Sequence, residues 1–124
     1  MPVWEIAVEA AFRAQHKLRG VPRSHGHLHT HRWTVRAILR ARTLTRSGWV
    51  LDFQDASDAL ARVIKPYEDR FLNELSPFDS INPTREKIAR FLAERLADEL
   101  KDDRVRVHRI DISEGTHRAS YIDD

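Results

Sequence analysis

Polar and hydrophobic positions alternate along two segments in the first third of the chain. Residues 3–14, VWEIAVEAAFRA, and residues 33–44, WTVRAILRARTL, combine this alternation with β-branched and aromatic side chains, which is typical of β-strands. The connection between them carries Gly20, Pro22 and Gly26 and is expected to be irregular. We therefore predict two long strands, the second of which begins within the histidine-rich residues before Trp33.

The spacing of the hydrophobic residues becomes helical after residue 52. Asp52 is the expected N-cap of a first helix that continues to Pro66 and beyond. A second helix is expected to start at residues 82–84 and to reach Leu100. The apolar stripes are Phe53, Ala56, Leu60, Val63, Ile64 and Tyr67 in the first helix, and Ile88, Phe91, Leu92, Leu96 and Leu100 in the second.

The end of the chain returns to strand-like pattern. Residues 105–112 and 118–122 are predicted strands, with a turn at residues 114–116. The resulting order, ββααββ, predicts an α+β fold in which a four-stranded antiparallel sheet carries two helices on one face, in a single domain over residues 1–124. Long strands at the sheet edges leave backbone groups unpaired, so we expect a homo-oligomer.

Composition narrows the possible partners and compartment. The 124 residues include 21 basic and 19 acidic side chains, for a net charge of +2, and the signs alternate, so nucleic acid is not an expected partner. The chain lacks an apolar run long enough to cross a membrane, and Glu5 interrupts the N-terminal apolar residues, so we expect a cytoplasmic protein without a membrane partner. With no cysteine, any metal must be held by nitrogen and oxygen.

Four histidines alternate in the segment SHGHLHTHRW at residues 24–33. Side chains two apart on a strand point to the same face, so His25 and His27 are expected to converge on one ion. His16, at the end of the first strand, is the best placed third ligand. Three neutral imidazoles leave a fourth position for water or substrate, the arrangement of a catalytic zinc. The alternative is a surface run of histidines that binds metal weakly.

Six short motifs, in this order and spacing, resemble one enzyme family. They are FRAQH (12–16), HGH (25–27), GWVLDF (48–53), RFLN (70–73), NPTREK (82–87) and ISEG (112–115). Together they span nearly the whole chain and resemble the 6-pyruvoyl tetrahydropterin synthase and 6-carboxytetrahydropterin synthase family.

The resemblance implies a fold, an assembly and a site. The fold is the tunnelling fold, in which three chains form a barrel and two such trimers form a hexamer with active sites between subunits. The family's zinc ligands correspond to His16, His25 and His27. Its pterin-anchoring glutamate corresponds to Glu114, and the pocket-lining residues to Thr84 and Glu86. Two alternatives stay open: Glu114 as a solvated turn carboxylate and Thr84 as a helix cap.

The chain departs from the family at the proton-transfer groups. The loop LRGVPRS lacks the family's cysteine, and YEDRFLN has Glu68 and Asp69 where the family has an Asp-His pair. A carboxylate in a partly desolvated cleft is a competent base, so Asp69 is the first candidate and Glu68 supports it. His29 is the second candidate, whereas His31 is expected to lie farther from the ion. The alternative is a solvated acidic pair beside Arg70.

The resemblance implies a zinc-dependent lyase that acts on 7,8-dihydroneopterin triphosphate or a related pterin, and the missing groups imply chemistry altered from the family norm. The basic residues Lys17, Arg19 and Arg23 suit the phosphates of such a substrate. A second hypothesis is a zinc-binding and pterin- or purine-binding module without catalysis. A third is a purely structural role without stoichiometric zinc.

Overall fold

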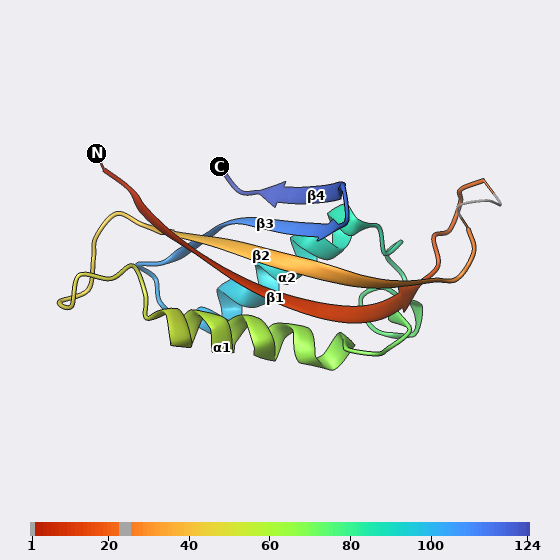
Figure 1. Cartoon of the computed structure of the whole chain (residues 1–124), viewed down its shortest axis with the longest axis horizontal. Coiled ribbons are helices and arrows are strands. Elements are labelled where there is room, and N and C mark those ends of the chain that lie inside the picture. The colour runs from red at the N-terminus through yellow and green to blue at the C-terminus, as the bar shows by residue number, and fades with distance from the viewer. Residues whose placement is uncertain (1, 23–25) are drawn as a thin grey trace.

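The computed structural model describes residues 2–22 and 26–124 and confirms the predicted ββααββ order. The strands and helices are β1 (Trp4–His16), β2 (His29–Ala41), α1 (Phe53–Ile64), α2 (Arg85–Leu100), β3 (Arg106–Glu114) and β4 (His117–Ile122) (Figure 1). Two short 3₁₀ helices, η1 (Lys65–Tyr67) and η2 (Leu72–Glu74), lie between α1 and α2.

The four strands form one antiparallel sheet in the order β1-β2-β3-β4. The β1–β2 pairing runs without a break from Trp4 opposite Ala41 to His16 opposite His29. Both strands therefore reach farther toward their connection than the hydrophobic alternation alone indicated. The β2–β3 pairing shifts register between Ile38 and Leu39.

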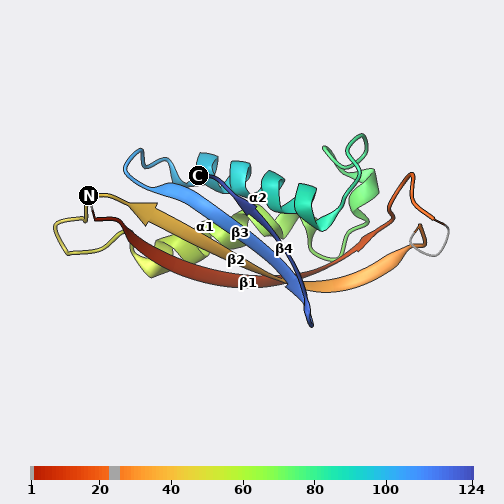
Figure 2. The ribbon, with the colours of Figure 1, turned by 90° about the horizontal axis from the view of Figure 1, so that it is seen from above.

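Both helices pack on the same face of the sheet, as predicted (Figures 1 and 2). α1 contacts β1, α2 contacts β3 and β4, and the two helices contact each other. The core lies between these layers, and each fully buried large apolar side chain contributes about 1.5–3 kcal/mol. Its largest fully buried members include Trp33, Phe12, Phe78, Leu39, Leu60, Leu72, Ile88, Leu92 and Leu96. No helix in the described part of the chain has the length and apolar character of a bilayer span.

The helix ends follow local chemistry. Asp52 accepts a hydrogen bond from the amide of Gln54 at 2.8 Å, and Thr84 accepts one from the amide of Lys87 at 3.2 Å. Both are side-chain caps of helix N-termini, so the capping role expected of Asp52 and weighed for Thr84 is confirmed. α1 ends at Ile64 and passes into η1, earlier than predicted, because Pro66 has no amide hydrogen to continue the helix.

The sheet face opposite the helices carries a buried carboxylate. The Asp111 side chain accepts hydrogen bonds from Ser120 Oγ and Arg109 Nε, both at 2.6 Å, and the residue is 5% exposed. Burial alone would raise the pKa of Asp111, but these hydrogen bonds and the charges of Arg109 and Arg118 hold it below its ordinary value.

Asp111 should therefore stabilise the fold at neutral pH and lose that effect in acid. Because its pKa is lower in the folded than in the unfolded chain, its contribution is present above the unfolded value near 3.9 and fades as the pH falls through the folded value. We expect Asp111→Asn to lower the free energy of unfolding by about 1.5–3 kcal/mol at pH 7, and by less at pH 3, in urea titrations. The exposed Asp98→Asn serves as control; an Asp111 effect independent of pH would contradict this expectation.

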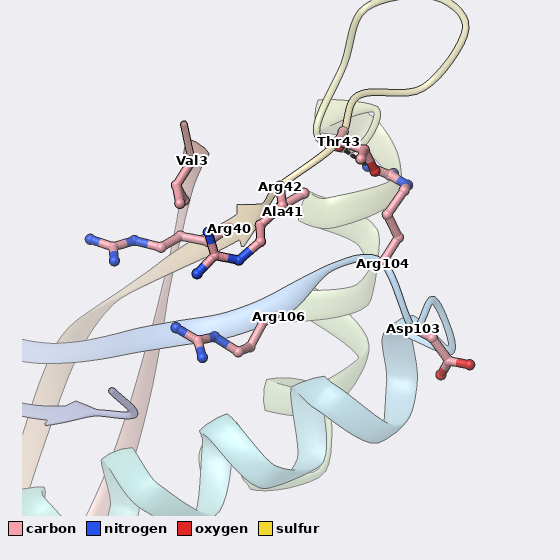
Figure 3. Close-up of a pocket in the computed structure, with 8 residues that line it drawn as sticks. All are labelled: Val3, Arg40, Ala41, Arg42, Thr43, Asp103, Arg104 and Arg106. Carbon is pink, nitrogen blue, oxygen red and sulfur yellow. Dashed lines mark hydrogen bonds between the residues drawn. The ribbon is translucent and has the colours of Figure 1, made fainter. Parts of the chain in front are cut away.

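The two ends of the sheet differ in chemistry. The end of β1 and the start of β2 carry histidines, at the side of the connection formed by residues 17–28. At the opposite end, arginines gather around the last residues of β2 and the first residue of β3 (Figure 3).

Candidate functional site

Three histidine rings meet where β1 ends and β2 begins. His16 lies directly opposite His29, and His31 follows two residues later on the same face of the sheet. The ring centres of His16 and His31 are 4.9 Å apart, those of His29 and His31 are 5.6 Å apart, and those of His16 and His29 are 6.1 Å apart. The strand register thus builds one cluster of three imidazoles, called here the histidine cluster.

The histidine cluster overlaps only in part with the metal ligands expected from the sequence. His16 belongs to it, His25 lies outside the described residues, and His27 is exposed in the bend before β2. His31, which was expected to lie farther from the ion, has its ring centre closer to that of His16 than His29 does. His29, expected to be a proton shuttle, also contacts His16.

His16 is held as a neutral imidazole. It is 4% exposed, and its Nδ1 lies 2.8 Å from the carbonyl oxygen of Pro83. Because a carbonyl only accepts hydrogen bonds, Nδ1 carries the proton and Nε2 keeps a free lone pair. Burial, together with the nearby His31 and His29, lowers the pKa of His16 to about 4 against the effect of the Pro83 hydrogen bond. This is the form of histidine that binds metals.

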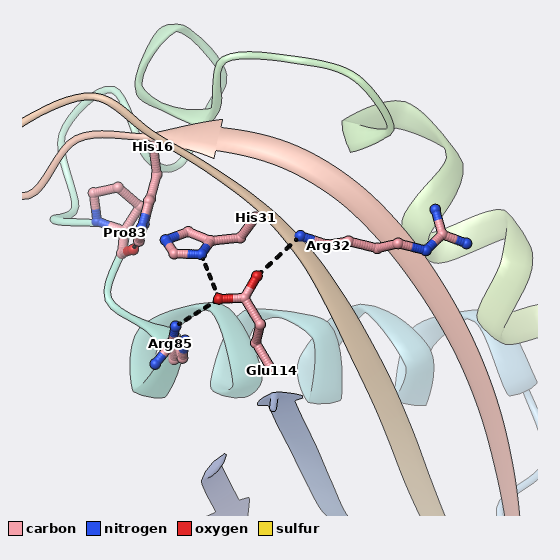
Figure 4. Close-up of polar contacts among 6 residues, drawn as sticks. All are labelled: His16, His31, Arg32, Pro83, Arg85 and Glu114. Carbon is pink, nitrogen blue, oxygen red and sulfur yellow. Dashed lines mark hydrogen bonds and ion pairs between the residues drawn. The ribbon is translucent and has the colours of Figure 1, made fainter. Parts of the chain in front are cut away.

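His31 is oriented by Glu114 (Figure 4). Its Nδ1 donates to Glu114 Oε1 at 2.7 Å, the amide of Arg32 donates to the second carboxylate oxygen at 3.2 Å, and Arg85 lies 3.5 Å from Oε1. Burial would raise the pKa of Glu114, but the hydrogen bond from His31 and these further contacts hold it below its ordinary value. Glu114 is therefore a bound carboxylate that fixes the His31 ring, not a solvated residue of a turn.

A cavity of about 450 Å³ opens beside the histidine cluster. Two of the three residues expected to bind a pterin line it: Thr84, whose hydroxyl already caps α2, and the exposed Glu86. The other lining residues are His16, Leu18, His29, His31, Arg85, His117, Arg118 and Ala119. Sequence reasoning did not include Arg85 or Arg118, which give the cavity two positive charges.

Two buried nitrogens at this site lack hydrogen-bond partners. Within the described residues, Trp33 Nε1 and Arg85 Nε are the buried side-chain nitrogen or oxygen atoms without a partner. Trp33 stacks on His31 with ring centres 5.2 Å apart, and Arg85 lines the cavity. Buried polar groups are normally paired, so the unpaired Nε of Arg85 at the cavity is typical of a position where a ligand or water completes the site.

The histidine cluster has the donor chemistry of a zinc site, and its ring centres lie 4.9–6.1 Å apart. Three imidazoles on one tetrahedral ion have ring centres about 5 Å apart, given zinc–nitrogen distances near 2.0–2.1 Å. Their outer nitrogens usually donate to a carbonyl or carboxylate, as Nδ1 of His16 and of His31 do. As the side chains lie, no three ligands among the described residues are placed to hold one ion, so coordination requires the side chains to rearrange.

Glu68 and Asp69 lie away from the histidine cluster in the same chain. Glu68 accepts from the amide of Arg13 at 3.0 Å, and Asp69 accepts from Arg13 Nε at 2.8 Å. Arg13 projects from the sheet face opposite His16, and the Asp69 side chain is 57% exposed. The expectation of a partly desolvated acidic pair is therefore wrong within one chain, and the partner of the pair is Arg13.

The connection after β1 is tied down by two motif asparagines. Asn73 Oδ1 accepts from the amide of Lys17, and Asn82 Oδ1 accepts from the amide of Arg19. The Arg19 guanidinium donates to the carbonyl of Phe78, and Arg23 lies outside the described residues. The asparagines of RFLN and NPTREK thus hold backbone in place, a role that the motifs did not reveal.

The sheet, its two helices and the histidine cluster at one end define a protein of the tunnelling-fold class. Residues 5–123 match the family model for 6-pyruvoyl tetrahydropterin synthase, so the chain belongs to that family.

Three solved structures share the fold at low identity. The structure is similar to 6-pyruvoyl tetrahydropterin synthase from Caenorhabditis elegans, with a TM-score of 0.84 and 19% identity over 100% of this chain and 98% of that one. An uncharacterized protein from Wolinella succinogenes gives 0.83 and 21%, covering 100% of both chains. A catalytic residue mutant of the Plasmodium vivax synthase gives 0.75 and 17%, covering 98% of both.

Proposed function

We propose that the protein is a zinc-dependent lyase that acts on 7,8-dihydroneopterin triphosphate or a related pterin, as a cytoplasmic hexamer. The observation that carries the proposal is the histidine cluster, in which two rings have their Nδ1 atoms bound to fixed acceptors beside a cavity. We propose His16, His29 and His31 as the zinc ligands in place of the set with His25 and His27. Bound zinc would act as a Lewis acid on a substrate hydroxyl or carbonyl.

Two carboxylates at the site, Glu114 and Glu86, are available to bind the pterin. A carboxylate can accept two parallel hydrogen bonds from the amino group and ring N–H of a pterin. Glu114 is the family's anchoring position, but three contacts already occupy it. Glu86 is exposed at the same cavity and makes no ion pair within the described residues, so we propose that Glu86 shares the pterin edge with Glu114, while Thr84 lines the pocket.

Proton transfer is assigned to Asp69, with Glu68 in support. Because both are bound to Arg13, whose side chain lies on the sheet face opposite His16, they are proposed to serve the histidine cluster of a neighbouring chain. This arrangement requires a homo-oligomer, which β1 as an edge strand also favours, although residues 69–71 already bond its outer edge at Arg13 and Gln15.

Incubation of the zinc-loaded protein with 7,8-dihydroneopterin triphosphate tests the function. We expect slow turnover that shortens or rearranges the side chain of the pterin. Chromatography and mass measurement of the products follow the reaction. Formation of the 6-pyruvoyl product should be absent or weak, because a missing acid-base relay typically costs about 100- to 10,000-fold. Calorimetric binding of the pterin with no product at high enzyme concentration would overturn the lyase proposal and favour a binding module.

A further inference from the structure

Three arginines converge at the end of the sheet farthest from the histidine cluster. Arg40 and Arg106 are direct partners across β2 and β3. Arg40 and Arg42 flank the buried Ala41, so both project to the face opposite the helices. Figure 3 shows the side chains of Arg40, Arg42 and Arg106 extending to the same side of the sheet. We call these three residues the arginine cluster.

The arginine cluster carries more positive charge than its surroundings neutralise. Arg40 donates to Glu5 at 2.8 Å. Neither Arg42 nor Arg106 makes an ion pair or a side-chain hydrogen bond with any residue that the structure describes. Asp103 points away from the cluster (Figure 3), so among the described residues Glu5 is the one carboxylate that forms an ion pair with it.

A fourth arginine closes the back of the same cavity. Arg104 donates to the carbonyl oxygens of Thr43 at 2.6 Å and Val50 at 2.5 Å, which ties the β2–α1 connection to the start of β3. The guanidinium of Arg104 therefore already donates hydrogen bonds within the chain. The cavity of about 390 Å³ in front of it is bordered by the arginine cluster.

Like charges on directly opposite strand positions destabilise a sheet. The Arg40–Arg106 pair is such a position, and an anion between the guanidinium groups would convert repulsion into attraction. Guanidinium groups match the oxygens of phosphate with two parallel hydrogen bonds, which a lysine ammonium group does not reproduce. A chain of linked phosphates presents several such oxygens to several arginines at once.

We propose that the arginine cluster binds the phosphate chain of a small molecule, either a free oligophosphate or a nucleotide. The site lies at the opposite end of β1 and β2 from the histidine cluster and uses none of its residues. It is therefore independent of the zinc and pterin proposals.

Calorimetry of the full chain with inorganic triphosphate, at constant ionic strength, tests the site. We expect the double variant Arg42→Gln, Arg106→Gln to raise the Kd for triphosphate more than about tenfold, equivalent to about 1.4 kcal/mol. The control Arg95→Gln removes the same charge from the exposed surface of α2 and should change the Kd less than about twofold. Equal affinities for triphosphate and ATP would identify the phosphate chain alone as the ligand. Tighter binding of ATP would identify a nucleotide as the ligand.

Thermal unfolding provides a second readout that does not depend on calorimetry. Triphosphate should raise the Tm of the unmodified protein and of Arg95→Gln, but not that of the double variant. If the double variant does not fold, Arg42→Gln alone carries the test, because Arg42 lies after the last paired residue of β2. Absence of triphosphate binding at about 1 mM, or binding equally tight in the variants and the unmodified protein, overturns the proposal.

Discussion

Replacement of His16 by alanine is expected to abolish stoichiometric zinc binding and, with it, turnover of the pterin substrate. His16 is the buried, neutral member of the histidine cluster, and its Nε2 lone pair has no other described use. Removal of a group that only orients a metal ligand lowers metal affinity roughly 10- to 100-fold. Removal of a ligand itself should therefore lower zinc affinity more than about 100-fold. Metal analysis and a zinc competition titration measure the effect.

Matched histidine variants distinguish the two possible ligand sets. His29→Ala and His31→Ala should lose zinc as His16→Ala does, whereas His27→Ala and the cavity-lining His117→Ala should keep it. Glu114→Gln leaves all three rings in place and should weaken zinc by only about 10- to 100-fold, because it acts through His31. Zinc loss in His27→Ala with retention in His29→Ala would restore the ligand set expected from the sequence.

Replacement of Asp69 by asparagine is expected to lower turnover by about 100- to 10,000-fold while zinc content stays unchanged. Asp69 has a left-handed backbone conformation with φ of 58°, fixed by the hydrogen bond from its amide to the carbonyl oxygen of Arg13. Residues other than glycine rarely adopt this conformation, and it is frequent at functional sites. Steady-state kinetics with zinc analysis measures the effect, and Asp79→Asn is an exposed control.

Mixed oligomers test whether Asp69 serves a neighbouring chain. His16→Ala damages the proposed metal site and Asp69→Asn the proposed proton-transfer group. If each site takes its histidines from one chain and its acid from the next, unfolding and refolding the two inactive variants together should restore part of the activity. Unchanged activity of Asp69→Asn, or inactive mixtures of variants that assemble normally, would contradict the shared site.

The helical part of the fold could be predicted to within a few residues because its signals are local. A capping side chain needs only the next turn of the helix, and an amphipathic stripe needs only its own residues. Asp52 therefore marked the start of α1 correctly, and the start expected at residues 82–84 includes Thr84, the cap of α2. The end of α1 was predicted too late, since the helical spacing continues past Pro66 although the hydrogen bonds do not.

The site could be predicted only in part because its members come from separate strands. The sequence contains three H-x-H pairs with identical spacing, and the irregular connection at residues 17–28 hides which of them faces His16. The one available signal was the proximity of His29 and His31 to the buried Trp33, which ties this pair to the core face of β2.

The sequence by itself determined the element order, the antiparallel α+β class, the helix caps and the supply of imidazole and carboxylate groups, since these follow from periodicity and local hydrogen bonding. Only the tertiary structure decided that His16 meets His29 and His31, that Glu114 binds His31, and that Asp69 pairs with Arg13 on the other side of the sheet. The physical reason is strand register: a side chain's face and its partners across a sheet depend on pairing between distant segments, and one step of register reverses both.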